Sequence, residues 1–369
     1  MVLFVLGAGA TRGASFVEEK NADGTPKRFC RPPLNGDFFT QLQRIRSEKH
    51  DQLVSQVIAD VVELFGVNFR GDMETVFTTL EHTIRMVGAT RENRRFSQEE
   101  LRKKRNRLLQ AIAAVLEESI CDGANAAPCR FHDTLVSNMA NHDAVITFNY
   151  DCTMDYALKT CGMGKWEPHY GYCLPIGQGQ RTIPGEDGWR PVGQERLAKA
   201  NTIRLLKLHG SLNFDVTEKY KRDGTIRERS VKLKTRPYTN QGRPLRFTII
   251  PPESAKAYDL GIFQSLWRQA GREIHRAKSI VVVGYSFPPT DLHSSALFRV
   301  NVPNNLRSIA VVNRDPDARR RAREILRAGI SPHTRVFSFE TLEEFAPIPR
   351  SVWRRSDTSE EARAEQSTN

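Results

Sequence analysis

The sequence VLFVLGAGAT, residues 2–11, decides the fold. Its first half is a continuous run of apolar and β-branched residues, which is typical of a parallel strand buried on both faces. Gly7 and Gly9 follow at once, and glycine at a strand end lets the backbone turn sharply and approach a phosphate group closely. Arg12 stands where a full G-x-G-x-x-G pattern would place its last glycine. A strand, a tight turn and a helix are therefore predicted, and the turn by itself is compatible with any α/β protein.

Further apolar runs of the same kind recur along the chain. They lie at residues 144–148, 203–208, 247–250, 279–283, 308–312 and 335–339. Between several of them, apolar residues repeat every three or four positions, as in 101–120 and 263–274, which indicates helices with one buried face. Strands that alternate with helices predict an α/β fold, a Rossmann-like doubly wound parallel sheet.

The long separation between the first two strands predicts a helical insertion or subdomain at residues 40–140, because a βα crossover needs far fewer residues. Helical patterns fill this stretch near residues 51–65, 74–87, 98–120 and 131–141. Such patterns without an intervening strand indicate a unit with a core of its own.

The remaining chain is organised around the same sheet. Residues 160–246 are expected to form a second, irregular and basic insertion, with a loop or a β-excursion at 215–246. We expect residues 1–350 to form one domain that contains both insertions. The polar stretch 351–369 predicts a flexible tail.

Composition narrows the classes of function. The chain of 369 residues carries 55 Lys+Arg and 43 Asp+Glu, a net charge of +12, so polyanions are plausible partners. No apolar run approaches the roughly 20 residues that span a bilayer, so we expect a cytoplasmic protein that does not enter a membrane. The six cysteines form no C-x-x-C pair, which argues against a zinc ribbon, and we expect no metal site.

Polar side chains follow four of the later strands, at the point where each strand ends. They are Asn149 with Asp151, His209, Ser286 after Gly284, and Asn313. Ligands of open parallel sheets bind at the carboxyl ends of the strands, so these side chains are candidates for one site. Histidine titrates near neutrality and suits a general base. Taken singly, each residue also suits a turn, a helix N-cap or a structural role.

In this order the motifs resemble those of the sirtuin superfamily. The series is G-A-G-x-T at 7–11, T-x-N-x-D at 147–151, H-G at 209–210, G-x-S at 284–286 and the strand-terminal Asn313. It is most similar to bacterial sirtuin-like domains that hydrolyse NAD as effectors of defence against phage. The resemblance covers residues 1–15, 144–155, 203–214 and 247–340, and it implies the sirtuin fold.

The resemblance also implies how NAD would be held. Residues that would contact the pyrophosphate are Gly7, Ala8, Gly9 and Thr11, with the threonine hydroxyl in place of the usual serine. Gly284 and Ser286 would contact a phosphate or the adenosine side, and Asn313 the adenosine ribose. Asp37 falls where the family has a cofactor-binding loop, although the flanking sequence differs.

The catalytic roles are implied in the same way. Asn149 would hold the nicotinamide ribose or the attacking water, Asp151 would face the carboxamide, and His209 would be the base. Deacylating sirtuins carry a four-cysteine zinc ribbon and a glutamine where Phe148 stands, and this chain has neither. We therefore expect an NAD⁺ hydrolase that releases nicotinamide and ADP-ribose, with NAD as substrate and no zinc.

Partners and alternatives stay open at this point. The resemblance implies a homo-oligomer that is activated by a partner such as a HerA-type ATPase or an Argonaute-like protein. Basic clusters at 91–107, 219–246 and 314–327 leave a nucleic-acid-binding or nuclease subunit as an alternative, and a non-catalytic NAD or ADP-ribose sensor is another. In the last cluster, helical spacing places Arg320, Arg323 and Arg327 away from the core, where like charges favour an acidic partner.

Overall fold

The structure, a computed structural model, describes residues 1–89, 95–123, 125–174, 201–220, 226–234, 247–251, 261–349 and 351. The predicted tail beyond Ser351 lies outside the described residues. The same holds for most of the predicted irregular connection and for parts of the basic clusters at 91–107 and 219–246. Within the described residues, no helix combines the length and the apolar character needed to cross a membrane.

Six parallel strands form the central sheet, in the order β12-β11-β10-β1-β4-β5. Their bounds are β1 (Val2–Leu6), β4 (Ala144–Thr147), β5 (Arg204–Lys207), β10 (Ser279–Val283), β11 (Ser308–Val312) and β12 (Arg335–Phe339). From β1 the chain winds outward through β4 and β5, then returns to β10 and continues through β11 and β12. This is the Rossmann strand order, and the predicted α/β fold is confirmed.

The winding direction reverses between β1 and β10. Leu6, the last residue of β1, pairs with Val283 on one side and with Thr147 on the other. The loops after these strands therefore leave the sheet side by side at its carboxyl edge. In doubly wound sheets such a reversal opens a crevice in which ligands bind.

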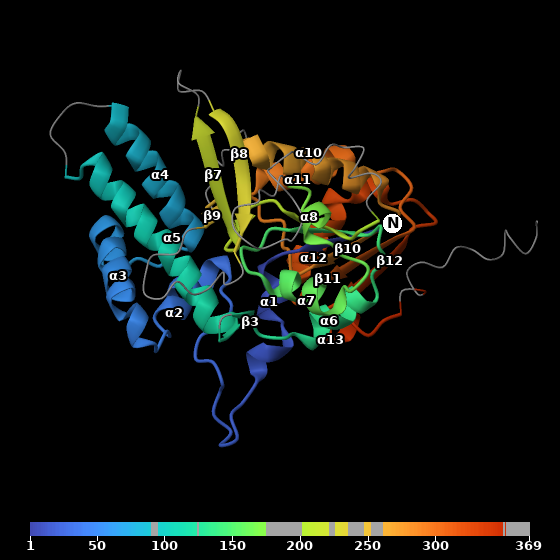
Figure 1. The fold of residues 1–369 in the computed structure, drawn as a ribbon, viewed down its shortest axis with the longest axis horizontal. Coiled ribbons are helices and arrows are strands. Elements are labelled where there is room, and N and C mark those ends of the chain that lie inside the picture. The colour runs from blue at the N-terminus through green and yellow to red at the C-terminus, as the bar shows by residue number, and fades with distance from the viewer. Residues whose placement is uncertain are drawn as a thin grey trace, which may run out of the picture.

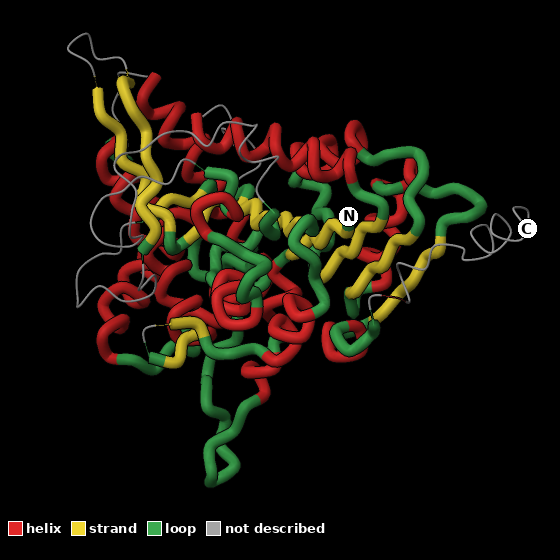
Figure 2. The backbone as a smooth tube through the Cα atoms, turned by 45° about the vertical axis from the view of Figure 1, so that its right-hand side comes forward, coloured by secondary structure: helices red, strands yellow, loops and turns green. Residues whose placement is uncertain are grey.

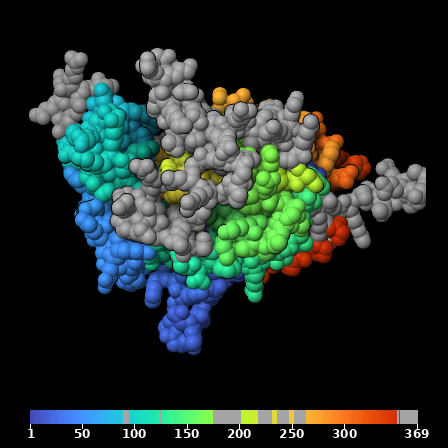
Figure 3. Space-filling view, viewed as in Figure 1, coloured from blue at the N-terminus to red at the C-terminus, as the bar shows by residue number. Residues whose placement is uncertain are grey.

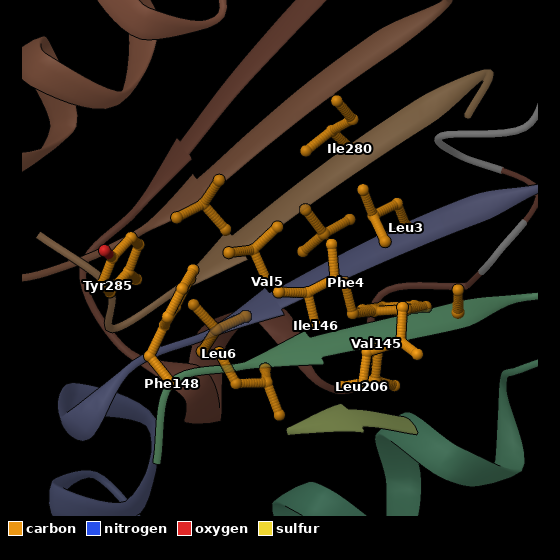
Figure 4. Close-up of a cluster of buried hydrophobic side chains, with 14 of the residues drawn as sticks. Leu3, Phe4, Val5, Leu6, Val145, Ile146, Phe148, Leu206, Ile280 and Tyr285 are labelled. Atoms are coloured by element: carbon orange, nitrogen blue, oxygen red, sulfur yellow. The ribbon is translucent and has the colours of Figure 1, made fainter. Parts of the chain in front are cut away.

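Burial on both faces explains why the strand sequences do not alternate. All residues of β1, β4 and β10 are buried, and their side chains form the core shown in Figure 4. The edge strand β12 has exposed and half-buried residues instead. Continuous apolar runs thus mark the strands that helices cover on both sides.

Helices cover the two faces of the sheet (Figure 1). One face carries α6 (Arg130–Ser137) and α7 (Thr153–Cys161), which pack against each other, and the other carries α10 (Gly261–Arg276) and α11 (Leu292–Asn301). The shorter or peripheral helices are α1 (Ala8–Arg12), α8 (Pro168–Gly171), α12 (Pro316–Ile325) and α13 (Leu342–Phe345). In α12 the apolar face is buried as predicted.

Two arginines of α12, Arg320 and Arg321, have acidic neighbours on the same chain. Arg320 pairs with Asp317 at 3.1 Å and with Glu324 at 3.7 Å, on the turns before and after it. Arg321 pairs with Asp315 at 3.4 Å. Arg323 donates to the Ser338 hydroxyl instead. An acidic partner for the face of Arg320, Arg323 and Arg327 therefore stays a prediction.

Four helices form a separate unit beside the sheet. They are α2 (Phe38–Leu42), α3 (Asp51–Phe65), α4 (Met73–Ala89) and α5 (Gln98–Ile120), and they share a second hydrophobic core. The unit appears as a lobe along one side of the molecule (Figure 3). Asp60 of α3 accepts from Lys104 at 2.7 Å and from Arg107 at 2.7 Å, and so ties α3 to α5. The three longest predicted helices are confirmed, whereas α6 packs with the sheet layer.

The stretch expected at 247–250 as a further parallel strand is the one strand assignment that was wrong. Here β9 (Thr248–Ile249) pairs antiparallel with β6 (Gly210–Ser211), outside the main sheet. The reason lies at Gly210, whose φ of +80° turns the chain out of the sheet, with Thr248 O only 2.2 Å from where a Cβ would lie.

The predicted β-excursion is a two-stranded antiparallel hairpin. It consists of β7 (Phe214–Tyr220) and β8 (Ile226–Leu233) and stands away from the main sheet (Figure 2). The remaining short elements are β2 (Cys121–Asp122) and β3 (Asn125–Ala126), with 3-10 turns η1 (Ser15–Glu18), η2 (Asn35–Asp37), η3 (Glu48–His50) and η4 (Arg327–Gly329).

Candidate active site

A cavity of about 440 Å³ lies at the carboxyl edge of the sheet, where β1 and β10 diverge. The loops after β1, β4, β5, β10 and β11 supply one wall. The helical unit supplies the other, through Met73 and Glu74 of α4 and through Ile112 and Leu116 of α5. The cavity therefore lies between the sheet and the inserted helices.

The structure brings almost all of the predicted site residues to this cavity. Those that line it are Ala8, Gly9, Thr11, Asn149, Asp151, His209, Gly284, Ser286 and Asn313. Two predicted residues, Gly7 and Asp37, do not line it. Residues far apart in the sequence thus line one cavity. They do so because each follows the carboxyl end of a strand in the same parallel sheet.

The glycines allow two loops to pack backbone against backbone. A Cβ on Gly7 would lie 2.5 Å from Tyr285 Cα, and one on Gly284 would lie 2.1 Å from Ala10 N. Gly284 also has a φ of +61°, which favours glycine. The Gly7 and Gly9 amides donate to the carbonyls of Val283 and Gly284, at 3.0 and 2.9 Å. The missing side chains therefore let the two loops touch, and these two amides hold the loops together.

Thr11, Asn149 and Asp151 form a hydrogen-bonded group at the end of β4. Asn149 Nδ2 donates to Gly7 O at 3.0 Å and to Thr11 Oγ1 at 3.1 Å. Thr11 Oγ1 donates to Asp151 Oδ2 at 2.8 Å, and Asp151 Oδ1 accepts from Thr153 N at the start of α7. Because both amide hydrogens of Asn149 are engaged, its carbonyl oxygen is the group it can offer to a ligand.

His209 follows β5 and is held among aromatic rings. Phe148 lies edge-on to the imidazole with centroids 5.0 Å apart, and Trp267 of α10 stacks at 6.4 Å. Phe148 in turn stacks on Tyr285 at 4.2 Å, and both rings stand at the end of the sheet core beyond Leu6 (Figure 4). His209 is 6% exposed, so the imidazole is buried among these rings.

Asp37 holds a loop rather than the cavity wall. Its carboxylate pairs with Arg12 Nη2 at 2.8 Å and accepts from Leu34 N and Gln41 Nε2. Its neighbours Asn35 and Gly36 do line the cavity. Asp37 therefore fixes the loop at 32–38 onto α1, next to the site.

The end of the cavity beside β11 is polar. Asn313 Oδ1 accepts from Asp315 N at 3.0 Å, and Asp315 itself lines the cavity and caps α12. Arg321 Nε donates to Ser286 O at 3.0 Å and so joins α12 to the loop after β10. Polar groups thus gather at the end of β11, while apolar side chains line the wall that the helical unit supplies.

No group of three or more histidine, cysteine or acidic side chains suited to a metal ion occurs in the described part of the chain. All six cysteines are free thiols. Zinc content stays a prediction.

No protein-family model and no curated protein matches the chain. Among solved structures it is similar to one described as a Sir2 homolog–NAD complex, at 14% identity and a TM-score of 0.38, covering 94% of this chain and 86% of that one. A second is Sir2 with an inhibitor, 2′-O-acetyl-ADP-ribose and a deacetylated p53 peptide, at 12% identity and a TM-score of 0.32, covering 94% and 90%. Similarity at this level assigns no role to any residue of the cavity.

The cavity residues that sequence reasoning missed include residues after β10, a residue after β11 and the wall of α4 and α5. Tyr285 and Asp291 follow β10, and the signal that could have found them is the one that found Ser286, a position after an apolar strand. Asp315 follows β11 in the same way. The lining residues of α4 and α5 carry no such signal, because a helix placed between two strands does not reveal which cavity it faces.

The arrangement has the parts of an acid–base site. It combines a buried imidazole, an amide oxygen fixed by two hydrogen bonds and a bare glycine turn around one cavity. An imidazole accepts and releases protons near neutrality, and a fixed acceptor orients hydroxyl groups.

Proposed function

We propose that the chain binds NAD⁺ in this cavity and hydrolyses the bond between nicotinamide and ribose. The observation that carries the proposal is the meeting of Asn149 and His209 at the ends of the neighbouring strands β4 and β5, on one cavity with the glycine turn after β1. The products are nicotinamide and ADP-ribose.

The chemistry asks for a positioned acceptor and a base. Breaking the nicotinamide–ribose bond builds positive charge on the ribosyl carbon, as in glycoside transfer, and the bonding electrons leave with nicotinamide as a neutral molecule. The Asn149 carbonyl oxygen orients the ribose hydroxyls or the water. The water oxygen bonds to the ribosyl carbon while its proton passes to His209, which later releases it to solvent.

The rest of the cavity suits the rest of the dinucleotide. The small residues Ala8 and Gly9 would leave room for the pyrophosphate, and Ser286 and Asn313, which line the same cavity, would contact the adenosine half. The apolar side chains of Ile112 and Leu116 line the cavity from the helical unit.

The biological setting is part of the proposal. The resemblance noted in the sequence supports an effector of phage defence that works in the cytoplasm as an oligomer. A protein partner of the HerA or Argonaute type would switch it on, because unregulated loss of NAD harms the cell.

The alternatives are less well supported. Arg320 and Arg321 of α12 have acidic neighbours on the same chain, so two of the positive charges of this basic cluster are already paired. A sensor has no use for a base, so the buried His209 on the cavity favours catalysis.

Product analysis tests the proposal directly. The purified chain, alone and with candidate partners, is incubated with NAD⁺ and the mixture is separated by chromatography. We expect equal amounts of nicotinamide and ADP-ribose. Calorimetry with NAD⁺ runs in parallel, and binding without turnover would favour the sensor. A chain that neither binds nor consumes NAD⁺ would contradict the proposal.

A further inference from the structure

The loop after β10 places a second charged group against His209. Asp291 Oδ2 lies 3.7 Å from His209 Nε2, and both side chains are buried, at 4% and 6% exposure. The same carboxylate oxygen accepts from the Tyr285 hydroxyl at 2.8 Å. The chain of contacts Tyr285–Asp291–His209 therefore lies at the cavity, which Tyr285 and Asp291 also line.

The loop that carries Asp291 is held in an unusual conformation. Phe287 has a φ of +47°, in the left-handed region that bulky residues rarely adopt. Its ring is buried against Phe298 of α11 and against Tyr285, with centroids 5.3 and 4.6 Å away. A conformation of this kind persists only where the surroundings hold it, and such sites cluster around functional residues.

We propose that Asp291 is a positioning residue that orients His209 and stabilises its imidazolium form when the histidine accepts a proton. This inference rests on the proposed function for its role in turnover. The ion pair between Asp291 and His209 that the inference requires does not depend on NAD.

A distance of 3.7 Å is too long for a hydrogen bond and short enough for an ion pair. Contacts of catalytic groups are often long without substrate and tighten when it binds. A carboxylate beside an imidazole favours the charged imidazolium and so raises the pKa of the histidine. Asp291 would thus make His209 a stronger base.

Among the residues that the structure describes, three other neighbours of His209 are a tyrosine, a tryptophan and a lysine whose polar groups bond elsewhere. Tyr150, after β4, lies with its ring 6.5 Å from the imidazole, and its hydroxyl donates to Ile250 O. Trp267 of α10 donates to Leu208 O. Lys207, on the same strand as His209, turns its ammonium group to Asp155 and to the carbonyl of Asp151.

Asp151 is a second buried acid among the described residues that line the cavity. Its two carboxylate oxygens accept from Thr11 Oγ1 and from Thr153 N. Asp151 therefore holds the hydrogen-bonded group around Asn149 in place, while Asp291 lies against His209.

The test is the pKa of His209, measured by NMR titration of its imidazole and assigned with a His209→Gln variant. Asp291→Asn removes the charge and keeps a residue that can cap α11, whose start Asp291 caps through Ser294 N. We expect the pKa of His209 to fall by about one unit or more. Asp315→Asn is the matched control, because Asp315 lines the same cavity and caps α12, and it should leave the pKa of His209 in place.

Turnover gives the second readout. In Asp291→Asn the acid limb of the pH–rate profile should move to lower pH by as much as the pKa of His209 falls. Turnover at neutral pH should fall about tenfold. A loss of turnover with an unmoved acid limb would reduce Asp291 to a structural residue and overturn the proposal, as would an unchanged pKa of His209. Asp291→Ser, which also caps helices, replaces Asp291→Asn if the latter does not fold. Absence of NAD turnover in the wild type contradicts the proposed function alone, since the titration needs no substrate.

Discussion

At the scale of single residues, the site depends on a few side chains whose partners are fixed. Asn149 donates both amide hydrogens, to Gly7 O and to Thr11 Oγ1. The imidazole of His209 packs against aromatic rings, among them Phe148. Preorganisation of this kind costs nothing at the moment of reaction, because the groups already stand in place.

Replacing Asn149 or His209 by alanine should therefore abolish most turnover. We expect a loss of about 10²–10⁴-fold, the usual contribution of a positioned acid–base group. The measurement is NAD consumption, with circular dichroism to show that the fold survives. His333→Ala, at an exposed histidine far from the cavity lining, is the control. Full turnover in His209→Ala would rule out a mechanism in which this histidine is the base.

A second residue-scale prediction concerns a buried pair beside the site. Burial would raise the pKa of the Cys129 thiol, but the His132 imidazole, 3.0 Å from the sulfur, and hydrogen bonds lower it to about 6. A group whose pKa is lowered by folding stabilises the fold at higher pH and loses that contribution as pH falls through the folded pKa. The wild type should thus lose stability as pH falls from about 7 to about 5.

Denaturant unfolding at several pH values checks this prediction. The loss should be smaller in Cys129→Ser, which cannot form a thiolate in this range. Cys30→Ser is the matched control: burial raises the pKa of the Cys30 thiol to about 12, so Cys30 is neutral throughout and its variant should follow the wild-type pH dependence. Identical curves for the wild type and Cys129→Ser would show that no ion pair forms.

At the scale of elements, the site is made by turns that bring strand ends together. The β1–α1 turn and the loop after β10 touch through backbone atoms at Gly7, Gly9 and Gly284. The register of β1 with β10 sets the level at which the two turns leave the sheet. A change at the contact should therefore disturb both loops.

Gly284→Ala tests this contact. Its φ of +61° is unfavourable for alanine, and its Cβ would lie 2.1 Å from Ala10 N. Gly123→Ala is the control, because Gly123 has a φ of +69° with no atom within 4 Å of the new Cβ. We expect about 1–2 kcal/mol of destabilisation for Gly123→Ala and about 1–3 kcal/mol more for Gly284→Ala. Equal free energies of unfolding in the two variants would contradict this prediction. They would show that the β1–α1 turn and the loop after β10 can move apart without destabilising the fold.

At the scale of the whole molecule, the inserted helices turn an open crevice into a cavity. Thr290, in the loop after β10, donates to Glu74 of α4 at 2.8 Å, which links the helical unit to the sheet. Asn35 accepts from Glu74 N at 2.9 Å and links the same helix to the loop before α2. The helical unit is therefore part of the cavity wall.

Leu116→Trp should fill the cavity from the helical side and leave Asn149 and His209 unchanged. We expect NAD affinity to fall about tenfold or more, because an added ring in a packed wall must displace the ligand or strain its surroundings. Calorimetry with NAD⁺ measures the effect. Asn106→Trp, at an exposed position of the same helix, should bind as the wild type does. Unchanged affinity in Leu116→Trp would place the ligand elsewhere.

Metal content is the remaining whole-molecule prediction. We expect elemental analysis of the purified protein to find no stoichiometric zinc, and chelators to leave the unfolding transition where it is, because the cysteines form no C-x-x-C pair. One zinc per chain would contradict this and reopen deacylation.

Sequence alone determined the sheet, because local patterns encode it. Continuous apolar runs such as Val2–Leu6 identify strands that must be covered on both faces, and parallel strands bring all their carboxyl ends to one edge. That reasoning assigned Asn149, His209 and Asn313 to one site without knowledge of the distances between them. It was wrong for 247–250, where a single left-handed glycine, Gly210, sends the chain out of the sheet.

Only the tertiary structure decided what surrounds those residues. The pairing of Asp291 with His209, and the hydrogen bonds that occupy Thr11 and Asp151, join positions far apart in the chain. The helical wall at Leu116 depends on how one unit packs against another. Strand and helix patterns arise from neighbours in sequence, whereas contacts between loops depend on register and packing, for which the order of residues carries no local signal.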